Sequence, residues 1–104
     1  KFYFLKFTCR DTGFMFYKVG ITTQKRWERR FSKSHYDCYD IEPVNIIEDT
    51  LYRCTEIESL CVKSLALYSV QHLLPLDFCG RSECFQFNEE VHESVKSLLS
   101  DMST

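Results

Sequence analysis

The chain has 104 residues, which suffices for one hydrophobic core and is too short for two. Hydrophobic residues make up 44% of it and charged residues 27%, a balance typical of a compact domain and not of a disordered segment. The longest run without a charge, 64–76, is too short for a membrane helix. We therefore expect residues 1–104 to form a single domain with no membrane partner.

Positive charge is concentrated in one part of the chain. The formal net charge is only −2, yet residues 18–33 contain six basic residues and one acid, Glu28. A basic patch on an otherwise acidic protein suits a polyanionic ligand that is bound at one place. The basic residues are Lys18, Lys25, Arg26, Arg29, Arg30 and Lys33.

The six cysteines favour packing over metal binding. They include no CxxC pair and have no histidine at ligand spacing, so a zinc site is unsupported. Cys54 and Cys61 occupy positions where a helix would bury a small apolar residue, and the residues after Lys1 do not resemble a secretory leader. We expect reduced core thiols in a cytoplasmic protein. A secreted structural domain held by disulfides is the alternative.

Apolar periodicity and turn residues predict the elements. Aromatic-rich runs bounded by turn residues indicate strands, and apolar residues three or four apart indicate helices. Thr22 or Thr23 would cap the basic helix and Asn88 the last one, while Pro75 would end the longest. In chain order we predict strands over 1–7 and 14–21 with a turn at 10–13, a short basic helix over 24–33, a strand over 44–48, a helix over 53–69, a strand over 82–87 and a final amphipathic helix with Val91, Val95, Leu98 and Met102 on its inner face.

Several motifs occur in a characteristic order. The N-terminal hairpin carries Tyr3 in its first strand, and its second strand ends in Tyr17-Lys-Val-Gly20. The basic segment 25–31 follows directly, and the next long helix carries a carboxylate. This combination resembles the GIY-YIG nuclease family over about residues 2–87.

The resemblance is to a variant branch common in bacteriophage and bacterial reading frames, in which the second motif reads Tyr-Lys-x-Gly. The runs 19–23 and 78–85 are similar to that branch. The chain departs from the commonest signature at two places. Its first motif reads Lys1-Phe-Tyr3, without Gly and Ile, and Lys18 stands where most members have Tyr.

The resemblance implies an α+β fold with a central three-stranded antiparallel sheet flanked by helices, followed by a C-terminal strand and helix. It also implies a metal-dependent DNA endonuclease that hydrolyses phosphodiester bonds to 5′-phosphate and 3′-hydroxyl ends, with Mg²⁺ or Mn²⁺ as cofactor. A catalytically inactive module that binds nucleic acid or protein is the alternative. Retention of Tyr3, Lys18, Arg26 and Glu58 favours the enzyme.

The candidate catalytic residues are Tyr3, Lys18, Arg26, His35 and Glu58. Glu58 would bind one divalent cation, with water completing its shell. Tyr3 would take a proton from the attacking water, its pKa lowered by the Lys18 ammonium. Arg26 would hold the scissile phosphate, and His35 would carry a proton or contact phosphate. Further DNA contacts are expected from Lys25, Arg29, Arg30 and Lys33.

Each candidate also has a structural interpretation. Tyr3 could pack in a core, and Arg26 and Arg30 could form the solvated face of a helix. Thr55-x-x-Glu58 matches a capping box, which would turn the carboxylate onto backbone amides. Glu56 is the reserve metal ligand. The remaining polar residues are given structural roles: a strand edge for Glu83, and surface positions for His72 and His92.

Overall fold

The computed structural model describes residues 1–74, 78 and 81–102. Its strands and helices follow the predicted order, so the α+β class is confirmed. Short 3-10 helices, labelled η, connect several of them. The elements are β1 (Phe2–Cys9), β2 (Met15–Ile21), η1 (Trp27–Arg30), α1 (Lys33–Cys38), β3 (Tyr39–Ile47), α2 (Leu51–Ser64), η2 (Ala66–Tyr68), η3 (Gln71–Leu73), η4 (Arg81–Glu83), β4 (Cys84–Gln86) and α3 (Glu89–Met102).

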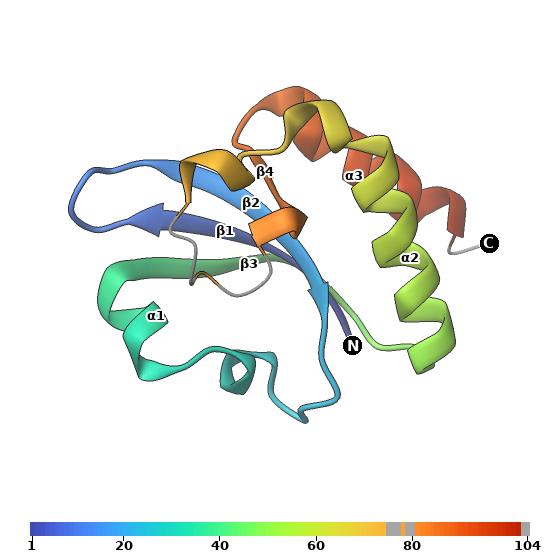
Figure 1. The fold of residues 1–104 in the computed structure, drawn as a ribbon. Coiled ribbons are helices and arrows are strands. Elements are labelled where there is room, and N and C mark those ends of the chain that lie inside the picture. The colour runs from blue at the N-terminus through green and yellow to red at the C-terminus, as the bar shows by residue number, and fades with distance from the viewer. Residues whose placement is uncertain (75–77, 79–80, 103–104) are drawn as a thin grey trace.

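The sheet has four antiparallel strands in the order β3-β1-β2-β4 (Figure 1). The first three strands form the expected antiparallel core of the sheet, and the C-terminal strand extends it by pairing with β2. Strand β1 lies inside the sheet because its residues are apolar on both faces, as a strand covered on both sides requires.

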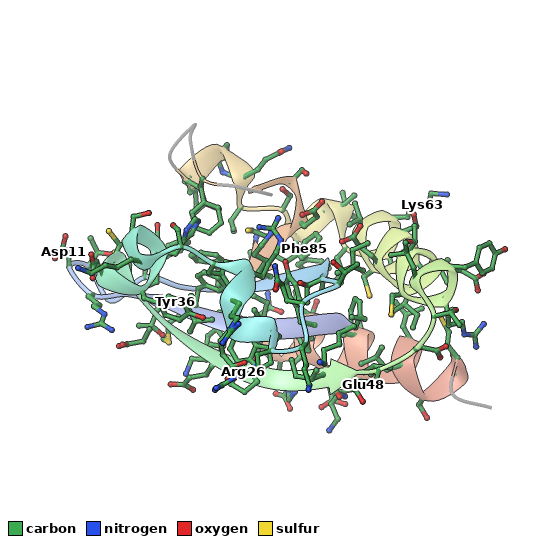
Figure 2. All side chains as sticks on the ribbon, turned by 90° about the horizontal axis from the view of Figure 1, so that it is seen from below. Asp11, Arg26, Tyr36, Glu48, Lys63 and Phe85 are labelled. Carbon is green, nitrogen blue, oxygen red and sulfur yellow. The ribbon has the colours of Figure 1, made fainter. Side chains whose placement is uncertain are left out.

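The two faces of the sheet carry two separate cores. Helices α2 and α3 lie side by side on one face, where they bury Phe2, Phe4, Tyr17 and Val19 in what we call the helix-side core (Figure 1). The opposite face is covered by the connections that contain η1, α1 and η3. In Figure 2, η1 and α1 lie in front of the strands. We call this the turn-side core; it contains Tyr3, Leu5, Phe7, Phe16, Phe31, Val70, Leu74, Phe78 and Cys84.

The predicted basic helix over 24–33 is wrong. The chain forms only the short η1, and a separate helix α1 begins at Lys33. Phe31 between them is extended, with its side chain buried against the rings of Tyr3 and Phe7. Insertion of this ring into the turn-side core interrupts the helix. Thr22 caps no helix and accepts a hydrogen bond from the backbone of Gln24 instead.

The third strand and the long helix also differ from their predicted bounds. β3 begins at Tyr39 and includes Pro43, which an edge strand tolerates because one side of it carries no ladder. α2 ends at Ser64, after which the chain continues as η2. Pro75, expected to end this helix, lies outside the described residues.

The C-terminal elements agree more closely. β4 is the central part of the predicted strand, and the Asn88 side chain accepts a hydrogen bond from the backbone of Val91 at 2.8 Å, so the predicted cap of α3 is confirmed. Val91 and Val95 are buried as expected. Leu99, rather than Leu98, is the third buried residue of this helix.

The cysteines divide into buried and accessible groups. Cys54, Cys61 and Cys84 are core residues, and burial raises the pKa of the Cys61 and Cys84 thiols to about 12 in each case. The interpretation of all cysteines as core residues is wrong for Cys38, which is exposed, and for Cys9, which is half-buried. Cys79 lies outside the described residues.

Among the described helices, none combines the length and the apolar character that crossing a membrane requires.

Candidate active site

Tyr3 and Lys18 lie on the same face of the hairpin. The register pairs Tyr3 with Gly20 and Leu5 with Lys18, so the two side chains are diagonal neighbours on adjacent strands. Both are only 1% exposed. Tyr17 points to the opposite face and joins the helix-side core, as strand alternation requires. The predicted placement of Tyr3 beside Lys18 follows from this register.

The phenol of Tyr3 lies over Gly20. A Cβ at position 20 would come within 2.3 Å of the Tyr3 hydroxyl oxygen, so the hydroxyl reaches the last part of β2. The ring itself meets Phe31 edge-on, with centroids 5.7 Å apart. Tyr3 is therefore a core residue through its ring, while its hydroxyl lies over Gly20 of β2.

Lys18 forms an ion pair with Glu83. Its Nζ lies 3.3 Å from Oε2 of Glu83, whose side chain is 30% exposed. The pairing of β4 with β2 explains this contact, because Lys18 is opposite Cys84 and Glu83 directly precedes it. The interpretation of Glu83 as a strand-edge residue is wrong, since it lies in η4 and contacts a candidate catalytic residue.

Glu58 belongs to the same group of charges. Its side chain is half-buried on α2, and this burial is the main reason that its pKa is raised. Repulsion from Glu83 raises the pKa further, whereas Lys18 and Arg30 lower it. Residues from β2, η1, α2 and η4 are thus close enough to act on one carboxyl group. Figure 1 shows the short η4, in orange, beside the second half of β2.

The capping-box interpretation of Glu58 is wrong. Thr50 is the N-cap of α2, and its side chain accepts a hydrogen bond from the backbone of Arg53 at 3.2 Å. Thr55 lies inside the helix and donates its hydroxyl to a carbonyl four residues earlier. Glu56, the reserve ligand, pairs with Arg53 at 3.3 Å. Glu58 is therefore not required by the cap.

The basic segment contributes Arg30 to the group rather than Arg26. Arg26 precedes η1, its side chain is 68% exposed, and it pairs with Glu28 at 3.5 Å (Figure 2). Arg30, at the end of η1, is the arginine whose charge lowers the pKa of Glu58. The expectation that Arg26 sits on the first turn of a helix fails because no helix forms there. Lys25, Arg29, Arg30 and Lys33 are exposed.

The three histidines differ in burial and contacts. His35 on α1 shares a hydrogen bond with the Ser32 hydroxyl at 2.9 Å, and its ring packs near Phe31 and Phe78. His72 is exposed as expected. His92 is not a simple surface residue, because its ring is half-buried and stacks 5.9 Å from that of Tyr17.

The donor set suits a hard cation with a large water shell. Glu58 and Glu83 supply two carboxylates close enough to repel each other. No group of three His, Cys, Asp or Glu side chains gathers within the described residues. One or two carboxylates with several waters is the usual arrangement for Mg²⁺, and Mn²⁺ accepts the same oxygen ligands.

Comparisons of the chain with family models, with curated proteins and with solved structures found no match.

Proposed function

We propose that this protein is a small metal-dependent DNA endonuclease of the GIY-YIG type. The observations that carry the proposal are the placement of Lys18 beside Tyr3 on one face of the hairpin and the action of the Lys18 and Arg30 charges on the Glu58 carboxyl group. The strand order, with β1 flanked by β2 and β3, is compatible with the central three-stranded sheet that the resemblance implies.

Hydrolysis of a phosphodiester requires a deprotonated water and stabilisation of the charge that builds on the phosphoryl oxygens. Tyr3 is assigned to the proton transfer, because it lies diagonally beside Lys18 on the same face of the hairpin. Arg30 is assigned to the phosphate, since a guanidinium binds two phosphoryl oxygens at once. Lys18 supplies positive charge beside Tyr3, and Glu83 offsets that charge until an anionic substrate arrives.

Glu58 would hold the divalent cation, and the charge of Glu83 would add to the attraction for that cation. A bound Mg²⁺ or Mn²⁺ supplies a Lewis acid that neutralises the phosphate. Burial and repulsion from Glu83 disfavour the ionised form of Glu58. A cation bound there would relieve this cost.

The DNA backbone would be contacted by the exposed basic residues around η1 and α1. Their contacts carry no sequence information, and they would give binding that weakens steeply with salt. The residues are Lys25, Arg26, Arg29 and Lys33.

The test is incubation of supercoiled plasmid with the protein in Mg²⁺, in Mn²⁺ and in EDTA. We expect nicking or linearisation with either metal and none in EDTA. Glu58→Gln should abolish cleavage, whereas Glu56→Gln, the matched control on the same helix, should cut at the wild-type rate. DNA binding without cleavage by the wild type in either metal would overturn the proposal and favour an inactive binding module.

A further inference from the structure

A small hollow opens where β2 ends. Its volume is about 270 Å³, and three segments meet around it: the connection after β2, the end of η1 and the start of α2. The hollow is lined by Ile21, Thr22, Thr23, Gln24, Arg30 and Leu51.

The wall formed by the connection after β2 is held in place by hydrogen bonds. The backbone N–H of Thr22 donates to the carbonyl of Lys1 at 2.9 Å, and the Thr22 hydroxyl accepts from the backbone of Gln24 at 3.1 Å. Thr22 is itself buried. The side chains that line this wall therefore project from a fixed backbone, which reduces the entropy lost when a ligand binds.

The hollow adjoins the candidate active site. Leu51 and Glu58 are seven residues apart on α2, so they share one face of the helix about 10 Å apart along its axis. Arg30 both lines the hollow and acts on the Glu58 carboxylate. At about 3.4 Å of rise per nucleotide, this separation corresponds to a few nucleotides of a strand.

The lining combines groups that recognise a nucleoside. Leu51 is 61% exposed and Ile21 is partly exposed, so the hollow offers apolar contact from both sides. The Gln24 amide and the Thr23 hydroxyl can bond to base edges or sugar, while Arg30 favours a phosphate.

We propose that this hollow binds a nucleoside of the substrate strand close to the scissile phosphate. The inference rests on the proposed nuclease function for its position relative to the cut, but binding of the nucleoside is measurable without cleavage. The net positive charge of the neighbouring 25–33 segment matches the charge of such a strand.

The first test measures affinity for a short fluorescein-labelled DNA duplex and for its single strand by fluorescence anisotropy. All variants carry Glu58→Gln to prevent turnover. Leu51→Ser should weaken binding about five- to tenfold by removing apolar contact, and Leu51→Met should bind like the parent. Tyr52→Ser is the matched control, because Tyr52 is 79% exposed and adjacent in sequence yet does not line the hollow. Equal losses for Leu51→Ser and Tyr52→Ser would overturn the proposal.

The second test moves a single abasic nucleotide along the strand. The parent protein should lose affinity at one or two adjacent positions, and Leu51→Ser should lose no more there than elsewhere. If the loss of affinity at each abasic position is the same for the parent and Leu51→Ser, the proposed subsite is refuted. If Leu51→Ser weakens DNA binding but the wild type does not cleave DNA, the nuclease proposal alone is refuted. If the wild type cleaves DNA but Leu51→Ser does not change binding, the subsite alone is refuted.

Discussion

The hydroxyl of Tyr3 occupies the space that a side chain at Gly20 would fill. A Cβ added at Gly20 would lie 2.3 Å from the oxygen and 2.4 Å from the ring carbon that bears it, closer than real Cβ contacts allow. Gly20 has no positive φ, so backbone freedom does not explain the glycine. The two residues are therefore coupled: the direction of the phenol depends on the absence of a side chain opposite it.

Gly20→Ala should destabilise the fold by about 2 kcal/mol, because the buried Tyr3 ring would have to move. In a Tyr3→Leu background the same change should be much less destabilising, since the clashing atoms are gone. Urea denaturation of the two single variants and the double variant measures this coupling.

Gly13 provides the control for this pair. Its φ is +75°, and no described atom lies within 4 Å of an added Cβ. Gly13→Ala should lose about 1 kcal/mol through backbone strain alone, and Tyr3→Leu should not reduce that loss. If Tyr3→Leu rescued both glycine variants equally, the steric explanation would fail.

Glu58→Gln should stabilise the metal-free protein at neutral pH. Burial raises the pKa of Glu58, so between its unfolded and folded pKa values the folded state binds more protons and stability falls as pH rises. The neutral isostere removes this dependence. The difference in Tm between variant and wild type should therefore be small at pH 4 and larger at pH 7.

Thermal unfolding in EDTA at the two pH values provides the measurement, and Glu56→Gln should show no comparable change because its carboxylate pairs with Arg53 near the surface. A Glu58→Gln variant that is less stable than wild type at pH 7 would return Glu58 to a structural role.

Glu83→Gln should destabilise the protein more than Lys18→Met. Removing Glu83 leaves a nearly buried ammonium without this carboxylate, which costs about 2 kcal/mol. Removing Lys18 takes away the charge together with its desolvation penalty, so the loss should be smaller, and the double variant should resemble Lys18→Met. Chemical denaturation distinguishes these outcomes. The exposed Arg10–Asp40 pair is the reference, and Asp40→Asn should change stability by less than about 0.5 kcal/mol.

Arg30→Ala should lose about 100-fold in turnover with little loss of DNA affinity, because its contact strengthens as charge develops on the phosphate. Arg26→Ala should mainly weaken binding, and Lys33→Ala should also reduce the slope of affinity against salt by about one. Single-turnover cleavage and salt-dependent anisotropy measure the two effects. A greater loss of turnover in Arg26→Ala than in Arg30→Ala would restore the role first expected of Arg26.

The strands and the two long helices could be predicted because their signals are local. Aromatic-rich runs bounded by turn residues identify β1 and β2, and the spacing of Cys54, Ile57 and Cys61 identifies α2. The caps are local too, yet two threonines near the start of α2 compete for the role. Only the structure shows that Thr50 caps the helix and that Thr55 lies within it.

The parts that could not be predicted depend on contacts between distant segments. Residues 24–33 do not form one helix, because burying Phe31 in the turn-side core stabilises the fold more than continuing the helix would. Glu83 reaches Lys18 only because β4 pairs with β2. Because β4 has only three residues, its pairing partner could not be predicted from the sequence. For the same reason, the sequence could not show that Arg30, and not Arg26, acts on Glu58, because this depends on the path of η1.

Pro43 has a consequence for how the molecule behaves among copies of itself. β3 is an outer strand of the sheet, and its residues Glu42, Pro43 and Val44 are exposed. An exposed edge normally offers a ladder to any other extended chain, but proline has no N–H to donate, and the register shift between Phe4 and Leu5 distorts the strand further. The β3 edge therefore resists pairing with strands of other molecules, the step that begins aggregation. This matters because the domain exposes several aliphatic residues.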